Sequence, residues 1–120
     1  MAYYPISVLM LAGNKYILII STPYELAGFI LSLGDGSDYG INFQYAEQPS
    51  PACLAQTFII GEEFIGDDSA CLVMRDNIFH GAGFSKLLHE SVHTAAEDKN
   101  VTIFGYCVND PERYGGCRIQ

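Results

Sequence analysis

The stretch Leu72-Val73-Met74-Arg75-Asp76-Asn77 decides the fold that this sequence predicts. An apolar run that stops at an aspartate is typical of a buried parallel strand whose carboxyl end places one acidic side chain in a crevice. Carboxylate oxygens suit Mg²⁺, so Asp76 is a candidate metal ligand. In the alternative, the Asp76 side chain only satisfies backbone donors, as an Asx-turn or a helix cap. The pattern leaves both roles open.

The segments before this stretch alternate between strand and helix patterns. Strands are predicted over residues 16–22 and 41–45, and helices over residues 5–13, 24–33 and 53–60, with a turn over 62–68. Strand, helix, strand, helix, strand is the order of a right-handed α/β sheet. Because no repeat or linker interrupts residues 1–120, we expect a single domain.

The segments after it predict one long helix and a last strand. Residues 84–97 have helical spacing of apolar residues, and residues 101–108 form a strongly apolar strand. The apolar stripe of the helix is expected to face the sheet; its members are Phe84, Leu87, Leu88, Ser91, Val92 and Ala95.

Composition and charge limit the classes of partner. The net charge is −8 and the six lysines and arginines are scattered singly, so nucleic-acid binding is not expected. No apolar run approaches the roughly 20 residues of a membrane span, and no basic region precedes the first one. Four widely spaced cysteines lack the close pairs of zinc or redox sites. We therefore expect a cytoplasmic protein with reduced thiols and no membrane partner.

The helix predicted over residues 84–97 contains a formal match to a zinc-protease motif. His89-Glu90-Ser91-Val92-His93 follows the H-E-x-x-H pattern, in which two histidines hold zinc and the glutamate activates water. Both histidines, however, fall on the polar side of the helix, and no third ligand is evident. We interpret them as part of a solvated face and rank zinc hydrolysis last.

Nine short stretches stand in a specific order along the whole chain. They are Tyr3-Tyr4-Pro5-Ile6-Ser7, Leu9-Met10-Leu11-Ala12-Gly13, Ile19-Ile20-Ser21-Thr22-Pro23, Leu33-Gly34-Asp35-Gly36-Ser37, Gln48-Pro49-Ser50-Pro51, Leu54-Ala55-Gln56, Phe64-Ile65-Gly66, Asp76-Asn77 and Asp110-Pro111-Glu112-Arg113-Tyr114-Gly115. Together they resemble the bacterial glucose-1-phosphate thymidylyltransferases, a family of sugar nucleotidylyltransferases. The resemblance covers essentially this whole chain but less than half of the family's usual length.

The resemblance implies an α/β fold with a Rossmann-like nucleotidyltransferase core, in which a mostly parallel sheet is flanked by helices. It implies that the family joins a deoxynucleoside triphosphate to a sugar 1-phosphate, with loss of pyrophosphate. The implied site residues are Gln48 at the thymine edge, Pro51 and Leu54 beside the base and sugar pockets, Asp76 as a ligand of Mg²⁺, and Tyr114 and Gly115 at the hexose.

Several departures from the family pattern limit what we expect of this chain. The family's glycine-rich loop G-G-x-G-T-R-L would precede residue 1, and a glutamate-lysine pair and a second metal-binding aspartate would follow residue 120. The family's usual glycines before Asp76 and Leu54 are here Arg75 and Cys53. Arg75 either blocks the pocket or partly replaces a lost cation, and we expect blocking.

The family's first strand would lie between the strands at residues 17–20 and 72–74. Its absence from this chain would leave two unpaired apolar edges, from which we predict a homo-oligomer. The preferred function is that of a truncated nucleotidylyltransferase-like protein with residual binding of dTTP or a dTDP-sugar and Mg²⁺, and without full transfer from one chain. One alternative is a non-enzymatic oligomeric interaction module; another is an active thymidylyltransferase completed by an oligomer or a second chain.

Overall fold

A computed structural model describes residues 2–50, 54–97, 100–105 and 108–110. Within these ranges the elements are α1 (Tyr3–Leu11), β1 (Tyr16–Ser21), α2 (Pro23–Leu33), a 3-10 turn η1 (Ser37–Tyr39), β2 (Asn42–Glu47), α3 (Leu54–Ile60), α4 (Glu62–Ile65) and α5 (Phe84–Glu97). No helix in the described part of the chain is both long and apolar enough to cross a membrane.

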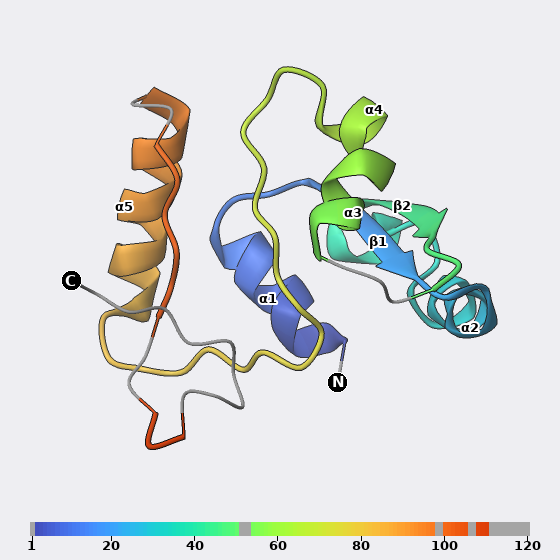
Figure 1. Cartoon of the computed structure of the whole chain (residues 1–120), viewed down its shortest axis with the longest axis horizontal. Helices are drawn as coiled ribbons and strands as arrows, with labels where there is room; N and C mark the ends of the chain where they lie inside the picture. The colour runs from blue at the N-terminus through green and yellow to red at the C-terminus, as the bar shows by residue number, and fades with distance from the viewer. Residues whose placement is uncertain (1, 51–53, 98–99, 106–107, 111–120) are drawn as a thin grey trace.

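The sheet consists of β1 and β2, which run parallel and are connected through α2. Their register places Tyr16 opposite Asn42 and Ser21 opposite Glu47. Pro23 occupies the first turn of α2, where its missing N–H costs nothing and its fixed φ favours the helix. In Figure 1 the two strands lie among α1, α2, α3 and α4, with α4 above them and α2 below. The predicted α/β class, a parallel sheet flanked by helices, is confirmed.

The main core lies between the sheet and helices α1 and α2. It is built around Ile6 of α1, Ile17 of β1, Leu33 of α2 and Phe43 of β2, all buried. Side chains alternate between the faces of a strand, so Leu18 points to the opposite face. There, the backbone at Gly61 between α3 and α4 comes so close that a Cβ on it would lie 3.4 Å from Leu18 Cδ2.

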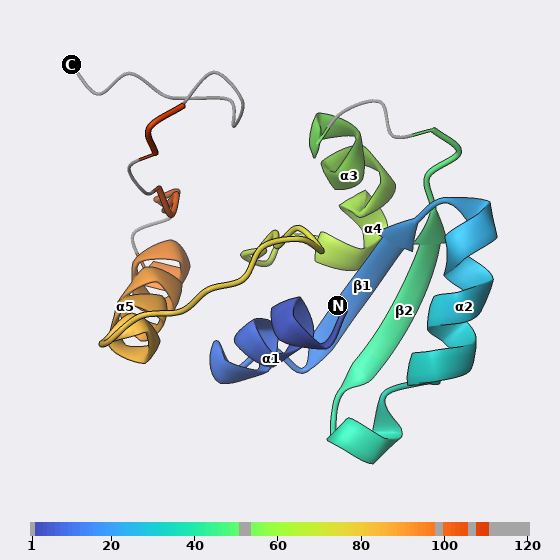
Figure 2. The same ribbon diagram turned by 90° about the horizontal axis from the view of Figure 1, so that it is seen from below.

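A second, smaller core joins α5 to α1. Leu88 of α5 is buried against Val8 and Ala12 of α1, and Phe79 and Phe84 pack against this cluster. The rings of Phe79 and Phe84 stack with centroids 5.4 Å apart. Figure 2 shows α1 between α5 and the sheet, so α5 is attached to the fold through α1 and not through a strand.

Three predictions from the sequence are therefore wrong. Residues 72–74 do not form a strand, and residues 101–105 do not either, while residues 106–107 lie outside the described part. The third error concerns α5, whose apolar stripe was expected to face the sheet. Its Leu88 packs on α1, and Leu87 and Val92 are exposed. An apolar run becomes a strand only where a neighbour accepts its backbone hydrogen bonds, and in the described residues β1 pairs with β2 alone.

The smaller boundary errors have local causes. The segment predicted as a turn over residues 62–68 begins with the short helix α4, and the loop after α2 contains η1. Gly36 before η1 has φ +86°, and a Cβ there would lie 2.7 Å from the Ile41 carbonyl oxygen. The chain therefore turns sharply into β2 at a position that requires glycine.

Candidate functional site

Gln48 lies directly after the carboxyl end of β2 and hydrogen-bonds to β1 and to α3. Its backbone N–H donates to the Ser21 carbonyl at the end of β1 over 2.9 Å. Its side-chain amide Nε2 donates to Gln56 Oε1 on α3, also over 2.9 Å. Both glutamine side chains are half-buried. The end of β2 is therefore held both to β1 and to α3, at the sheet edge where open α/β folds bind ligands.

Leu54 is the first residue of α3 and is 53% exposed. It lies two residues before Gln56, which holds the Gln48 side chain. The hydrogen bond between Gln48 and Gln56 thus joins the end of β2 to the first turn of α3, the turn that begins at Leu54. That region combines an amide that can donate and accept hydrogen bonds with an accessible apolar side chain.

Asp76 lies in a tight turn and not at the end of a strand. The Asn77 N–H donates to the Met74 carbonyl over 3.2 Å, so Arg75 and Asp76 are the central residues of the turn. Both border a hollow of about 510 Å³ between this turn, α1 and α2; its other lining residues are Ala2, Tyr3, Phe29, Ser32 and Leu33. Gln48 and Leu54 are not among the residues that line this hollow.

Arg75 connects the Asp76 turn to the first turn of α2. Its Nη1 lies 3.0 Å from Glu25 Oε1. The other carboxylate oxygen, Glu25 Oε2, accepts a hydrogen bond of 3.2 Å from Ser21 Oγ. The hydrogen bonds from Arg75 and from Ser21, and the charge of Arg75, lower the pKa of Glu25. This carboxylate is therefore ionised at neutral pH and loses its charge only as the pH falls through that lowered pKa.

The donor set around Asp76 fits one mode of Mg²⁺ binding. In the described residues no three His, Cys, Asp or Glu side chains come together as a metal cage. A lone carboxylate beside a hollow does fit a Mg²⁺ ion that takes most of its ligands from water and phosphate oxygens. The chain could therefore hold this ion together with a phosphate ligand, and the described residues do not form a closed site for the ion alone.

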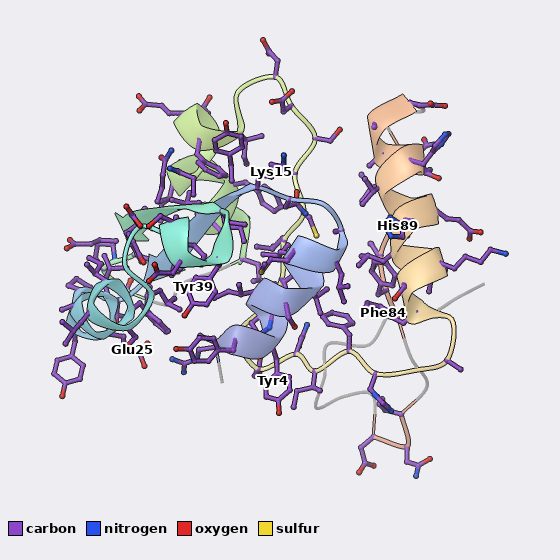
Figure 3. All side chains as sticks on the ribbon, turned by 180° about the vertical axis from the view of Figure 1, so that it is seen from behind. Tyr4, Lys15, Glu25, Tyr39, Phe84 and His89 are labelled. Carbon is purple, nitrogen blue, oxygen red and sulfur yellow. The ribbon has the colours of Figure 1, made fainter. Side chains whose placement is uncertain are left out.

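The zinc-protease pattern on α5 has no site around it. His89 and His93 are exposed, as predicted, and His93 Nε2 lies 3.2 Å from Glu97 Oε1 one turn further on. Figure 3 shows His89 on α5 at the opposite side of the molecule from Glu25 on α2. A catalytic zinc needs three protein ligands around an open position, which the described part of the chain does not assemble on this helix.

The structure describes only some of the candidate site residues that were predicted from the sequence. Gln48 is bonded to Gln56 of α3, the helix that begins at Leu54, and Asp76 borders a hollow whose lining does not include Gln48 or Leu54. Pro51, Tyr114 and Gly115 lie outside the described residues. The expectation that Arg75 blocks the pocket stays a prediction.

Sequence reasoning missed Glu25 and the pairing role of Gln56. An acidic residue in the first turn of a helix that follows a strand is a weak signal for Glu25, since such residues are common there. Gln56 carries no comparable signal, because its partner Gln48 lies in another element and only the fold brings the two amides together.

Comparison with known proteins shows a consistent set of relatives. The family described as "Nucleotidyl transferase" matches residues 1–120. A glucose-1-phosphate thymidylyltransferase of Neisseria gonorrhoeae is 56% identical over 96% of this chain and 39% of its own length. The enzyme of that name from Xanthomonas campestris pv. campestris (strain B100) is also 56% identical, over 96% of this chain and 38% of its own length. The one from Mycolicibacterium smegmatis is 44% identical, over 96% of this chain and 38% of its own length. The chain thus spans about two fifths of the length of these relatives.

Proposed function

Because this chain belongs to the nucleotidyl transferase family, we propose that it binds the nucleotide of a sugar-nucleotide reaction, with the base at Gln48 and Leu54. The observation that carries the proposal is the position of Gln48. Its side chain is held by Gln56 at the carboxyl end of a parallel strand, where α/β folds receive ligands. A ligand can exchange this amide partner for the edge of a base, since an amide both donates and accepts.

The proposed ligand is a thymidine nucleotide. The relatives are named for transfer of a thymidylyl group to glucose 1-phosphate, and this chain shares 56% of its residues with two of them over the matched length. A thymine ring offers the donor and acceptor pattern that a glutamine amide complements, and an apolar residue such as Leu54 suits the face of the ring. We extend the proposal to Mg²⁺ at Asp76, where the ion would neutralise phosphate charge.

We propose binding without transfer by this chain alone, because phosphoryl transfer needs several positive charges around the phosphates. The described residues include three lysine or arginine side chains, and Arg75 is the one that borders the Asp76 hollow. It is already paired with Glu25. Lys86 lies on α5 and pairs with Glu90 at 3.8 Å. Charge stabilisation from the described part of the chain is therefore weak.

Thermal or urea unfolding with dTTP and Mg²⁺ tests the proposal. A ligand at 100 times its dissociation constant is expected to raise the free energy of unfolding by about 2.7 kcal/mol. Gln48→Ala and Asp76→Ala should each remove most of this increase. Gln44→Ala is the matched control, because Gln44 is an exposed glutamine on the same strand.

The result that contradicts the proposal is the absence of any stabilisation of the unaltered chain by dTTP or dTDP-glucose, with or without Mg²⁺. Equal loss of stabilisation in Gln48→Ala and Gln44→Ala would also argue against a base site at Gln48. Pyrophosphate release from dTTP and glucose 1-phosphate, measured on the same samples, would show that the chain carries out transfer as well.

A second function, that of an oligomeric interaction module, is favoured by exposed apolar side chains. Tyr24 and Leu31 on α2 are 94% and 90% exposed, and Ile59 on α3 is 71% exposed. Contact with another copy would remove such surface from water. The expected result is an oligomer by light scattering at micromolar concentration that Leu31→Ser weakens. A monomer at that concentration would contradict this function, and Ser32→Ala on the same helix is the control.

A further inference from the structure

The carboxylate of Glu25 contacts two segments that are far apart in the sequence. Oε1 pairs with Arg75 Nη1 at 3.0 Å, and Oε2 accepts the hydroxyl of Ser21 at 3.2 Å. Ser21 is the last residue of β1, and Arg75 lies in the turn that presents Asp76. One side chain on α2, labelled in Figure 3, therefore joins the end of a strand to that turn.

The connection continues from Ser21 to Gln48. The Ser21 carbonyl accepts the backbone N–H of Gln48 over 2.9 Å, and the Gln48 side chain donates to Gln56. A continuous series of hydrogen bonds thus runs from the Asp76 turn through Glu25 and Ser21 to Gln48. Gln48 and Asp76 do not share a hollow, so this series is a physical link between the two parts of the proposed site.

We propose that Glu25 is a positioning residue: it fixes the turn that carries Asp76 relative to the strand end that carries Gln48. The inference rests on the proposed function for its meaning in nucleotide binding, since Gln48 would hold the base and Asp76 the phosphate-bound ion. A nucleotide that contacts both residues needs Gln48 and Asp76 at a constant separation. Glu25 sets that separation without touching the ligand.

The exposure of the ion pair distinguishes this role from a general stabilising one. The side chains of Arg75 and Glu25 are 57% and 43% exposed. Exposed pairs contribute little to the free energy of unfolding and are screened by salt. Loss of the pair should therefore leave the melting temperature nearly unchanged, while the turn at residues 74–77 becomes more mobile.

Amide hydrogen exchange of Asn77 in the ligand-free protein measures the effect directly, because its N–H closes the turn. Glu25→Gln is expected to speed amide exchange at Asn77 by about two- to five-fold. This factor is the equilibrium change that corresponds to losing the interaction of one exposed ion pair. Exchange within β1 and β2 should not change. Glu90→Gln, which breaks the exposed Lys86–Glu90 pair on α5, is the matched control and should leave Asn77 unaffected.

The double variant Glu25→Arg with Arg75→Glu restores the ion pair in reverse and should return the Asn77 rate toward that of the unaltered chain. Unchanged Asn77 exchange in Glu25→Gln would overturn the inference. So would equal acceleration in Glu90→Gln, because the effect would then not be specific to the turn.

A titration with dTTP and Mg²⁺ separates this inference from the proposed function. If the unaltered chain binds dTTP, Glu25→Gln should raise the dissociation constant for dTTP by a similar factor of about two to five. Unchanged affinity would overturn a role in the nucleotide site. If the unaltered chain does not bind, the proposed function fails, and the Asn77 rates still decide whether Glu25 fixes the turn.

Discussion

Replacing Phe43 by alanine is expected to lower the free energy of unfolding by about 3–5 kcal/mol, the usual cost of removing a buried phenylalanine. Phe43 is 6% exposed and lies in the centre of the main core with Ile6, Ile17 and Leu33. Its ring also lies 6.3 Å from that of Tyr39 and 6.4 Å from that of Tyr45. The change leaves a cavity where α1, α2 and both strands meet.

Urea unfolding followed by far-ultraviolet circular dichroism measures this loss, because the midpoint falls with stability. Tyr24→Ala is the matched control: Tyr24 is also aromatic but is 94% exposed on α2, so its removal should change stability by less than about 0.5 kcal/mol. A loss of less than about 1 kcal/mol for Phe43→Ala would contradict the description of this core.

Leu88→Ala is expected to detach α5 from α1 at a cost of about 2–5 kcal/mol. Leu88 is 3% exposed and holds α5 against Val8 and Ala12. Among the described residues, the buried members of this cluster are distinct from those of the main core, and α1 contributes to both. Hydrogen exchange should therefore become faster along α5, while amides of β1 and β2 keep their protection.

Leu87→Ala provides the control for this second change. Leu87 precedes Leu88 on the same helix but is 49% exposed, so its truncation should leave exchange in α5 nearly unchanged. If Leu88→Ala instead accelerates exchange equally in α5 and in the strands, the two cores form one cooperative unit, and α5 is not separately attached.

The elements of the first half of the chain were predictable because their signals are local. Pro23 begins α2, and Gly13 follows α1 with φ +85°, which suits the residue after a helix. The apolar run of residues 16–22 corresponds to β1 nearly residue for residue. α5 likewise begins and ends at the predicted residues, 84 and 97.

The candidate site was predictable only in part. The resemblance to nucleotidylyltransferases placed Gln48 and Leu54, and the fold does bring the end of β2 next to the start of α3. Their role in holding a base stays a prediction. Glu25 was missed, because its contacts with Arg75 and Ser21 depend on how α2 lies across the end of the sheet.

The sequence by itself determined the family, the α/β class and the position of six of the elements, because these depend on motif order, on caps and on the period of apolar residues. Only the tertiary structure decided the state of Leu72-Val73-Met74 and the surface on which α5 packs. A strand needs a neighbour for its backbone hydrogen bonds, and in the described residues β1 has one partner, β2. The apolar run therefore forms no strand and is partly exposed, and Asp76 lies in a turn whose Arg75 pairs with Glu25 of α2.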